Sequence, residues 1–532
     1  MNLKVFLSLM AMLFVTKLTA QAKYFSSSLP LVYISTQKEI LDEPKIIAQM
    51  GITWNGPSQD NQSFSDYNHF FGNIAIEIRG SSSQMFPKKS YGFELRDNED
   101  ADMDFPLLEM PEEEDWILYA PYSDKSLIRN VLLFSLAEKL GAYAPRCRLV
   151  ELFLNDSYQG VYVLMEKIKR DKNRLDIAKL KADDNDGEEL TGGYIVKVDK
   201  LTGSGGDGWS SNYKNASNRV TYYQYEEPEA EDISTQQANY IQDYIDAFET
   251  AVYNEDFDPL EGYQSYANIN SFIDYIIMNE LSKNVDGYRL STFLYKDKNE
   301  KLNAGPLWDF NLAFGNADYY YGWETTGLQV YADLGEDEWQ NPFWWKGLLR
   351  DQYFTKALKC RWEELSTAQL SNNSIEQVVD SLVNVLDEPA ERNFLRWPVL
   401  GEYVWPNYYV AQTFNSEISW LKHWIVERMR VLNYMLPGDC DGEIEVPYEF
   451  AISTYPSPFT TQLNIRITSD DNISLQIDFF TINGSRVFSQ KAVIRKGENN
   501  IEINTASLPR GVYVYRIIKG DVEVKTEKIV KM

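Results

Sequence analysis

Two aspartates in the middle of the chain have the type and spacing that phosphate chemistry requires. Asp286 follows a helix expected over 268–283, and Asp309 stands in the sequence Trp-Asp-Phe-Asn at 308–311. Asp286 can accept a proton from a substrate hydroxyl, while Asp309 and Asn311 can hold Mg²⁺ through oxygen atoms. Phosphoryl transfer needs both functions. Spacing alone equally suits acidic residues that cap helices or face solvent.

A glycine- and serine-rich segment with two lysines is a second candidate for phosphate contact. It runs from Arg79 through Gly-Ser-Ser-Ser to Lys88 and Lys89. Backbone N–H groups of such a turn approach phosphate closely, and a lysine entering the next strand acts as a point charge. We assign Arg79, Ser82, Lys88 and Lys89 to nucleotide binding, without deciding which lysine contacts phosphate. The residue order is not that of a P-loop, and a polar hairpin with a basic tip also explains the segment.

Two further segments contain candidate functional residues. Asp124 to Asn130 opens an amphipathic helix expected over 125–140, in which apolar residues recur every four positions. Its polar residues either cap a solvated helix start or reach the site. The run from Gly160 reads as a strand that ends at Glu166. A nucleotide base could bind beside this strand. The pattern is equally consistent with a strand of the hydrophobic core that has no functional role.

Composition excludes several classes of function. The 532 residues include 51 Lys+Arg against 79 Asp+Glu, so the net charge of −28 disfavours nucleic acid and anionic membranes as partners. A hydrophobic content of 44% excludes a wholly disordered chain. The histidines are His69 and His423, too few for a zinc cluster or a triad. We expect Cys147, Cys360 and Cys440 to be buried thiols.

The chain divides into a targeting segment and two folded regions. Residues 1–22 read as a signal peptide, and no later apolar run could span a bilayer, so we expect an exported protein. Residues 23–437 are strand-rich over about 31–200 and helix-rich over about 234–436. After a linker at 438–451, short strands over 452–532 indicate a small all-β sandwich. Expected strands include 31–35, 73–79, 90–96, 116–120, 148–154, 160–165, 193–199 and 291–297, and expected later helices are 234–252, 268–283, 346–366, 374–387 and 412–435.

Taken together, these segments resemble the CotH family of spore-coat-protein-H-like atypical kinases. The resemblance covers about three quarters of the chain, from about Leu31 to Leu436. No single segment is specific to the family, but the ordered set is. The matching segments lie at 76–83, 87–91, 116–130, 158–167, 192–195 and 305–311.

The resemblance implies a fold and a set of roles. The fold would be α+β, with a divergent protein-kinase-like domain of two lobes that hold ATP and Mg²⁺ or Mn²⁺ between them, followed by the small β sandwich. Carried over by position, Lys88 or Lys89 would contact the nucleotide phosphates and Glu166 would lie near adenine. Asp286 would be the catalytic aspartate and Asp309 the metal-binding one.

Two residues depart from the patterns of kinases. Ordinary kinases place a metal-binding asparagine five residues after the catalytic aspartate, where this chain has Ser291. Family members often carry Asp-x-Asp in the motif that here ends in Asn311. The loss of a carboxylate weakens Mg²⁺ binding, which puts full activity in question.

The C-terminal region resembles the type A sorting domain of the type IX secretion system. The matching residues are Tyr455 to Phe459, Asn483-Gly484, Leu508 to Tyr515 and the basic residues from Lys525 to the end. This implies a Bacteroidota-type cell, export across the outer membrane and contact with the secretion machinery. A carbohydrate-binding sandwich is the rival interpretation.

Three functions follow in order of preference. The first is an exported kinase that phosphorylates Ser or Thr of secreted or cell-surface proteins. The second is a catalytically weak or inactive relative that acts as a binding or adhesion module. Its aromatic residues at 341–345, Trp397, Trp405, Tyr408 and Tyr409 would form a glycan or protein platform, unless they are core residues. A glycoside hydrolase ranks last, because no motif singles out a carboxylate pair.

Overall fold

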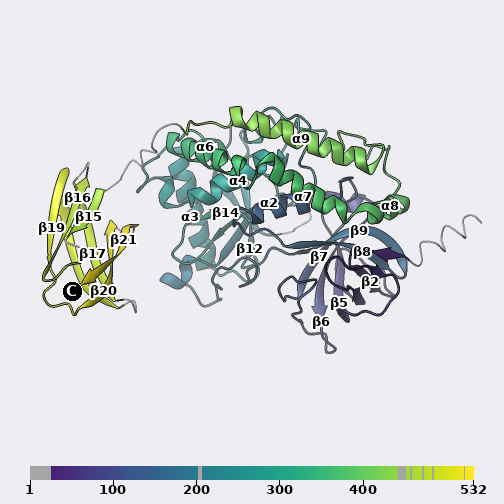
Figure 1. Ribbon diagram of the computed structural model, residues 1–532, viewed down its shortest axis with the longest axis horizontal. Coiled ribbons are helices and arrows are strands. Elements are labelled where there is room, and N and C mark those ends of the chain that lie inside the picture. The colour runs from purple at the N-terminus through teal and green to yellow at the C-terminus, as the bar shows by residue number, and fades with distance from the viewer. Residues whose placement is uncertain are drawn as a thin grey trace, which may run out of the picture. The chain divides into compact units, whose positions relative to one another are not determined.

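The structure is a computed structural model that describes residues 25–201, 206–440, 451–455, 458–469, 472–481, 485–519 and 522–532 (Figure 1). The chain forms two compact units, Met1–Asp256 with Tyr266–Cys440, and Phe257–Ser265 with Asp441–Met532. The signal peptide expected over 1–22 lies outside the described residues. No helix in the described ranges is long and apolar enough to cross a membrane.

The first unit begins with a closed seven-stranded barrel. Ile74 and Ile76, from the alternating strand expected over 73–79, are fully buried in its core. The barrel closes where the first strand pairs in parallel with a later one, which places Leu31 opposite Glu151. In barrel order the strands are β2 (Leu31–Ser35), β3 (Ile46–Thr53), β5 (Phe70–Arg79), β6 (Ser90–Arg96), β7 (Asp115–Tyr119), β9 (Ser157–Glu166) and β8 (Cys147–Leu154); β1 (Ser26–Ser27) and β4 (Asn61–Gln62) form a separate pair.

The closed barrel corrects the predicted fold class. A protein-kinase-like domain of two lobes is wrong for this chain, because the strand-rich region closes on itself instead of forming an open sheet. The sequence interpretation placed one strand and then loops before residue 60, and so it missed β3. That strand pairs with β2 on one side and β5 on the other. With β3 in place each of the seven strands has two neighbours, and the barrel has no free edge.

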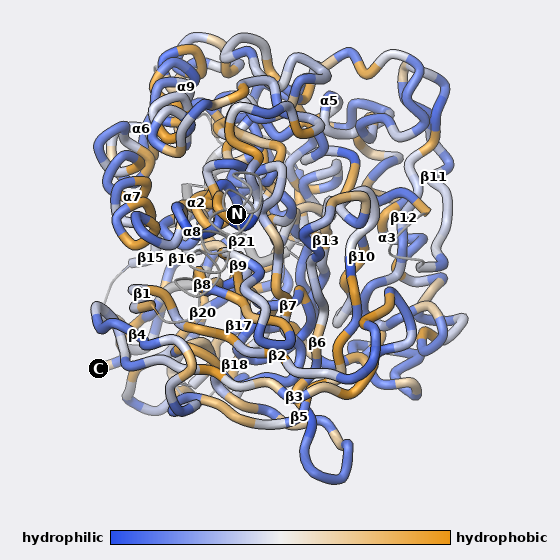
Figure 2. Tube along the Cα trace, turned by 90° about the vertical axis from the view of Figure 1, so that its right-hand side faces the viewer, coloured by the Kyte–Doolittle hydropathy of each residue, from blue (hydrophilic) through white to orange (hydrophobic). Residues whose placement is uncertain are grey.

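A five-stranded antiparallel sheet and a group of helices complete the first unit (Figure 1). All predicted helices are present, but the one expected over 346–366 is two helices separated at 349–351. The turns of α6, α7 and α9 alternate between hydrophobic and hydrophilic colour in Figure 2, as expected for helices with one buried face. The sheet order is β11 (Gly208–Lys214), β12 (Val220–Glu227), β10 (Tyr194–Val198), β13 (Thr292–Lys296) and β14 (Asn303–Ala304); the helices are α2 (Arg129–Glu138), α3 (Thr235–Tyr253), α4 (Ile269–Ser282), α5 (Phe343–Leu348), α6 (Gln352–Thr367), α7 (Asn372–Asn384), α8 (Asp387–Arg396) and α9 (Phe414–Met435).

A disulfide joins α6 to the residues that follow α9. It links Cys360 to Cys440 across a sequence separation of 80. The expectation of three buried thiols is therefore wrong for two of them, and only Cys147 is free. Sequence spacing could not reveal the bridge, because it depends on α6 lying beside α9. Trp362 of α6 donates a hydrogen bond from Nε1 to Asn433 Oδ1 of α9 at 2.8 Å.

The second unit contains two antiparallel sheets with one shared core. Buried residues from both sheets, such as Ile465, Ile503, Phe479 and Tyr515, form a single hydrophobic cluster. The three-stranded sheet has the order β15 (Ala451–Tyr455), β16 (Gln462–Ser469) and β19 (Gly497–Asn504). The four-stranded sheet has the order β18 (Arg486–Ile494), β17 (Ile473–Thr481), β20 (Gly511–Lys519) and β21 (Val522–Lys531).

Candidate active site

Asp286 lies in the connection between α4 and β13. Lys283 ends α4 in a left-handed conformation, with φ of 46°. Three residues later, Asp286 accepts hydrogen bonds at both carboxylate oxygens, from Arg289 Nη2 at 2.6 Å and from the Tyr319 hydroxyl at 3.1 Å. Arg289 also bonds to Asp337 at 3.0 Å. These contacts fix the orientation of the Asp286 carboxylate.

The segment that carries Asp309 is fastened to both neighbouring segments. Asp309 has a φ of 61°, which is unusual for a residue other than glycine. Its carbonyl oxygen accepts a hydrogen bond from Asn284 Nδ2 at 3.1 Å, which ties it to the Asp286 connection. The N–H of Phe310 donates to Asn130 Oδ1 of α2 at 2.7 Å. Through Asn130, the predicted segment 124–130 therefore contacts the segment that carries Asp309. It is not a solvated helix start.

Arg129 anchors the same segment through a buried ion network. Its guanidinium donates to Asp124 Oδ1 at 2.6 Å, to Glu417 Oε1 at 2.9 Å and, through Nε, to the Ala313 carbonyl oxygen at 3.1 Å. Both carboxylates are nearly fully buried. Asp124 Oδ2 also accepts the N–H of Arg129, the first residue of α2, at 2.9 Å.

Charges from several segments meet around Asp309. Solvent reaches its side chain, but desolvation by the surrounding protein, followed by the negative charges of Asp286 and Asp199, raises the pKa of Asp309 to about 6. The positive charges of Arg79 and Lys200 oppose this rise. Asp309 therefore interacts both with Asp286, with which the sequence analysis paired it, and with Arg79 of the glycine- and serine-rich segment.

Asp199 is a residue of this cluster that the sequence analysis missed. It directly follows β10, the strand expected over 193–199, and burial raises its pKa. Ser291, at the position where ordinary kinases have a metal-binding asparagine, lies with Oγ 3.5 Å from Asp199 Oδ2. A carboxylate at the end of a buried strand was the available signal in the sequence.

The donor chemistry at Asp309 and Asn311 fits a hard divalent cation. Asn311 Oδ1 is buried and, within the described residues, has no hydrogen-bond partner. An unpartnered buried oxygen costs stability unless something binds it. Mg²⁺ takes oxygen ligands and keeps several of its waters, so one carboxylate and one amide oxygen are a sufficient protein contribution. A cation there would also relieve the mutual repulsion of Asp309 and Asp286.

The two lysines assigned to nucleotide phosphate make other contacts in the structure. Lys88 is buried, and its ammonium donates to the Val161 carbonyl oxygen at 2.6 Å and to Asn393 Oδ1 at 2.9 Å. Burial lowers the pKa of Lys88 well below its usual value. Lys89 donates to the carbonyl oxygen of Gln84. Neither lysine is among the charges that act most strongly on Asp309.

The glycine- and serine-rich turn is closed by a hydrogen bond from Gln84 Nε2 to the Gly80 carbonyl oxygen at 2.7 Å. Ser82 is exposed and begins a short 3-10 helix, Ser82–Met85. Gly80 has a φ of 108°, and a Cβ there would lie 2.1 Å from Ser83 Oγ, so the turn requires glycine. Arg79, at the end of β5, lies with Cζ 5.8 Å from the ring centre of Trp308, next to Asp309. Of this segment, Arg79 is the residue that reaches the aspartate cluster.

Glu166 is fully buried and fully paired. Oε1 accepts from Arg146 Nε at 2.9 Å, and Oε2 accepts from the Arg146 N–H at 3.0 Å and from the Tyr143 hydroxyl at 3.2 Å. Tyr143 packs on the same hydrophobic cluster as Trp308. Glu166 is thus connected to the Asp309 segment through Tyr143 and this cluster, not by direct contact.

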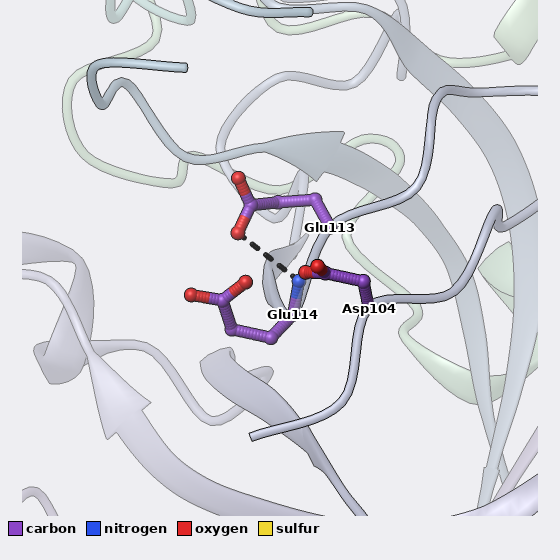
Figure 3. A group of neighbouring side chains, drawn as sticks. All are labelled: Asp104, Glu113 and Glu114. Atoms are coloured by element: carbon purple, nitrogen blue, oxygen red, sulfur yellow. Dashed lines mark hydrogen bonds between the residues drawn. The ribbon is translucent and has the colours of Figure 1, made fainter. Parts of the chain in front are cut away.

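A second acidic group involves residues that the sequence analysis did not single out. In the described part of the chain, Asp104, Glu113 and Glu114 form the one set of three acidic residues whose oxygens lie within 4.8 Å of one another (Figure 3). Lys169 Nζ bonds to Glu113 at 3.0 Å and to Glu114 at 2.8 Å. The ammonium supplies the positive charge that this group needs, so we interpret it as a salt-bridge cluster.

Comparison with known families agrees with the resemblance described above. Residues 76–432 match the model of the CotH kinase protein family, and residues 453–532 match that of the secretion system C-terminal sorting domain. No curated protein matches the chain significantly. The second match implies export and contact with the secretion machinery. The chain therefore belongs to the CotH kinase protein family and carries a C-terminal sorting domain for secretion.

Proposed function

We propose that the protein is an exported kinase that transfers the γ-phosphate of ATP to serine or threonine hydroxyls of secreted or surface proteins. The arrangement that supports this most strongly is the placement of Asp286, held by Arg289 and Tyr319, in a segment that is bonded to the segment of Asp309. The Asn284–Asp309 hydrogen bond holds their two segments together. Family membership agrees with this reaction class.

The chemistry assigns one role to each aspartate. The substrate hydroxyl oxygen bonds to the γ-phosphorus, and the bond from that phosphorus to the β–γ bridging oxygen breaks. The hydroxyl proton passes to the Asp286 carboxylate, which Arg289 and Tyr319 keep oriented, and ADP leaves with the bridging oxygen. Asp309 and Asn311 would hold Mg²⁺ or Mn²⁺, which offsets phosphate charge when bound.

We propose Arg79 and Lys200 as the residues that attract the phosphates. Both positive charges act on Asp309. The ammonium of Lys88, in contrast, already donates two hydrogen bonds inside the protein. An arginine that replaces a lysine also offers paired donors that match phosphate geometry.

The sorting domain bears on the cell compartment in which phosphorylation would take place. The match to a secretion-system sorting domain supports passage through the type IX machinery of a Bacteroidota-type cell. Because ATP is scarce outside the cytoplasm, we propose that phosphorylation takes place in the periplasm during export. The mature protein would then be released or attached at the cell surface.

Calorimetric titration of ATP with Mg²⁺ or Mn²⁺ tests this proposal. Wild-type protein should bind the metal–nucleotide complex, Asp309→Asn should bind it at least tenfold more weakly, and Asp60→Asn should match wild type because Asp60 is an exposed aspartate outside the site. Affinity should also fall as the pH drops through about 6, where Asp309 takes up a proton. Equal binding by wild type and Asp309→Asn would contradict the assignment.

A binding module without catalysis is the second candidate. Ser291 contacts Asp199 only weakly, and it supplies no amide oxygen where ordinary kinases have one. Nucleotide binding without phosphate transfer to any acceptor would favour this alternative.

A further inference from the structure

A pocket of ≈ 310 Å³ lies between α9 and the loop over residues 323–326. The loop contributes Trp323, Glu324, Thr325 and Thr326. The helix contributes Trp420, His423, Trp424 and Glu427, whose spacing of three, four and seven residues places them on one face. None of these residues is part of the proposed phosphotransfer site.

Buried donors fix the loop that forms one wall of this pocket. Lys283 Nζ donates to the carbonyl oxygens of residues 324 and 326, at 3.0 and 2.6 Å. Arg428 Nη1 donates to that of residue 325 at 2.7 Å, and Trp424 Nε1 to that of residue 323 at 2.8 Å. Arg428 is completely buried and Lys283 nearly so. All four carbonyl groups of the loop are therefore held, and the pocket is formed before any ligand binds.

Stacked aromatic rings make up the apolar part of the pocket. Trp323 stacks on Tyr408 with ring centres 4.8 Å apart, and Trp420 stacks on Tyr409 at the same distance. The predicted aromatic platform is thus divided. Tyr408 and Tyr409 stack on the two pocket tryptophans. Trp344 and Trp345, in contrast, are fully buried core residues.

The polar groups of the pocket include two carboxylates, and each has one oxygen engaged by a neighbouring side chain. Glu324 is exposed at the edge, where Oε2 accepts from the Thr326 hydroxyl at 3.3 Å. Glu427 accepts from Arg430 at 3.1 and 3.0 Å, and both bonds go to Oε2.

We propose that this pocket binds a single neutral pyranose unit of a glycan. A pyranose has C–H faces that pack on aromatic rings, and its hydroxyl groups both donate and accept hydrogen bonds. The hydroxyls can donate to Oε1 of Glu324 and of Glu427, since the hydrogen bonds given above for both carboxylates go to Oε2. A quaternary ammonium ion has no hydrogen to donate to these carboxylates, and an acidic sugar would be repelled by them. The volume lies at the lower end of the range for ligand pockets, about 300–1,000 Å³, which suits one sugar unit.

Saturation-transfer NMR on the full-length protein tests the proposal. The probes are the methyl glycosides of glucose, galactose, mannose and N-acetylglucosamine, each at millimolar concentration, with tetramethylammonium and methyl glucuronide as comparisons. At least one neutral glycoside should give signal. Trp420→Leu, which removes the ring on which the sugar would pack, should weaken binding severalfold, and Glu324→Gln should also weaken it.

Controls separate loss of the pocket from loss of the fold. Tyr434→Ala removes an aromatic residue of α9 that is 82% exposed and outside the pocket, so it should bind like wild type. Each variant should keep the wild-type melting temperature, and Glu324 is exposed enough that its substitution leaves the fold intact. Binding of no neutral glycoside, unchanged binding in both pocket variants, or signal from tetramethylammonium or methyl glucuronide alone would overturn the proposal.

Discussion

Replacing Arg129 by methionine tests whether a buried ion network holds the Asp309 segment. The Arg129 side chain is 1% exposed, and the carboxylates that it pairs with, on Asp124 and Glu417, are 1% and 2% exposed. Its Nε also satisfies the Ala313 carbonyl oxygen. Methionine has a similar length but removes the charge and these hydrogen bonds.

The expected loss of unfolding free energy is large because the partners stay buried. Removing one member of a buried ion pair costs about 3–5 kcal/mol, and an unpartnered carbonyl adds about 1 kcal/mol. Burial already raises the pKa of Glu417, against the opposing charge of Arg129, so the variant raises it further. Protonation of Glu417 limits the total, and we expect a loss of about 4 kcal/mol at neutral pH.

The same linkage gives the pH dependence of the effect. When the pKa of a carboxyl is higher in the folded state than in the unfolded state, the folded protein takes up the proton first as the pH falls. The ionised form is the destabilised one, so the penalty is present above the folded pKa and shrinks below it. The loss caused by Arg129→Met should therefore be smaller at about pH 5 than at neutral pH.

Urea unfolding followed by tryptophan fluorescence measures this loss in the first unit alone. All 13 tryptophans of the chain lie between Trp54 and Trp424. Adding Glu417→Gln to Arg129→Met removes one buried charge and should recover part of the lost stability. A loss below about 1 kcal/mol, as for a surface pair, or a loss that does not change with pH would refute the reasoning.

Three other perturbations test separate parts of the structure. Replacing Cys360 and Cys440 by alanine should lower the unfolding free energy by about 4 kcal/mol in urea, since the bridge closes a loop with a sequence separation of 80; no change would contradict its formation. Gly315→Ala should cost about 2 kcal/mol in the same assay, because φ is 76° and the new Cβ would lie 2.5 Å from Trp424 Cδ1; a neutral effect would mean that the contact is wrong. Without divalent ions, Asp309→Asn should raise the melting temperature above pH 6, since the ionised carboxylate is disfavoured there. That gain should shrink as the pH falls below about 6 and disappear below about pH 3, where the acid is protonated in both the folded and the unfolded state, and a pH-independent gain would argue against the raised pKa.

Local patterns in the sequence predicted the elements and the central pair of aspartates. The alternation around Ile76 identified a barrel strand, and the four-residue repeat after Asp124 identified α2. Asp286 and Asp309 were singled out by their type and spacing, and the structure joins their two segments through the Asn284–Asp309 hydrogen bond, while their roles stay predictions. In these cases the information lay within a few residues of each site.

Long-range pairing accounts for what the sequence analysis missed. Closure of the barrel depends on β2 meeting β8 more than a hundred residues later, which no local pattern specifies. Helix α8 was missed because it begins with acidic residues and Pro389, although proline is tolerated in the first turn. Asp199 was missed because its strand gave no sign of facing the other aspartates.

The most direct test of the central claim is phosphate transfer from γ-labelled ATP. Wild-type protein with Mg²⁺ or Mn²⁺ should label itself or an added protein acceptor on serine or threonine. Asp286→Asn and Asp309→Asn should abolish labelling while each keeps a cooperative urea transition, and Asp60→Asn should label like wild type. Labelling that persists in both site variants, or its absence from wild type with every metal and acceptor, would contradict the assignment of these aspartates to phosphoryl transfer.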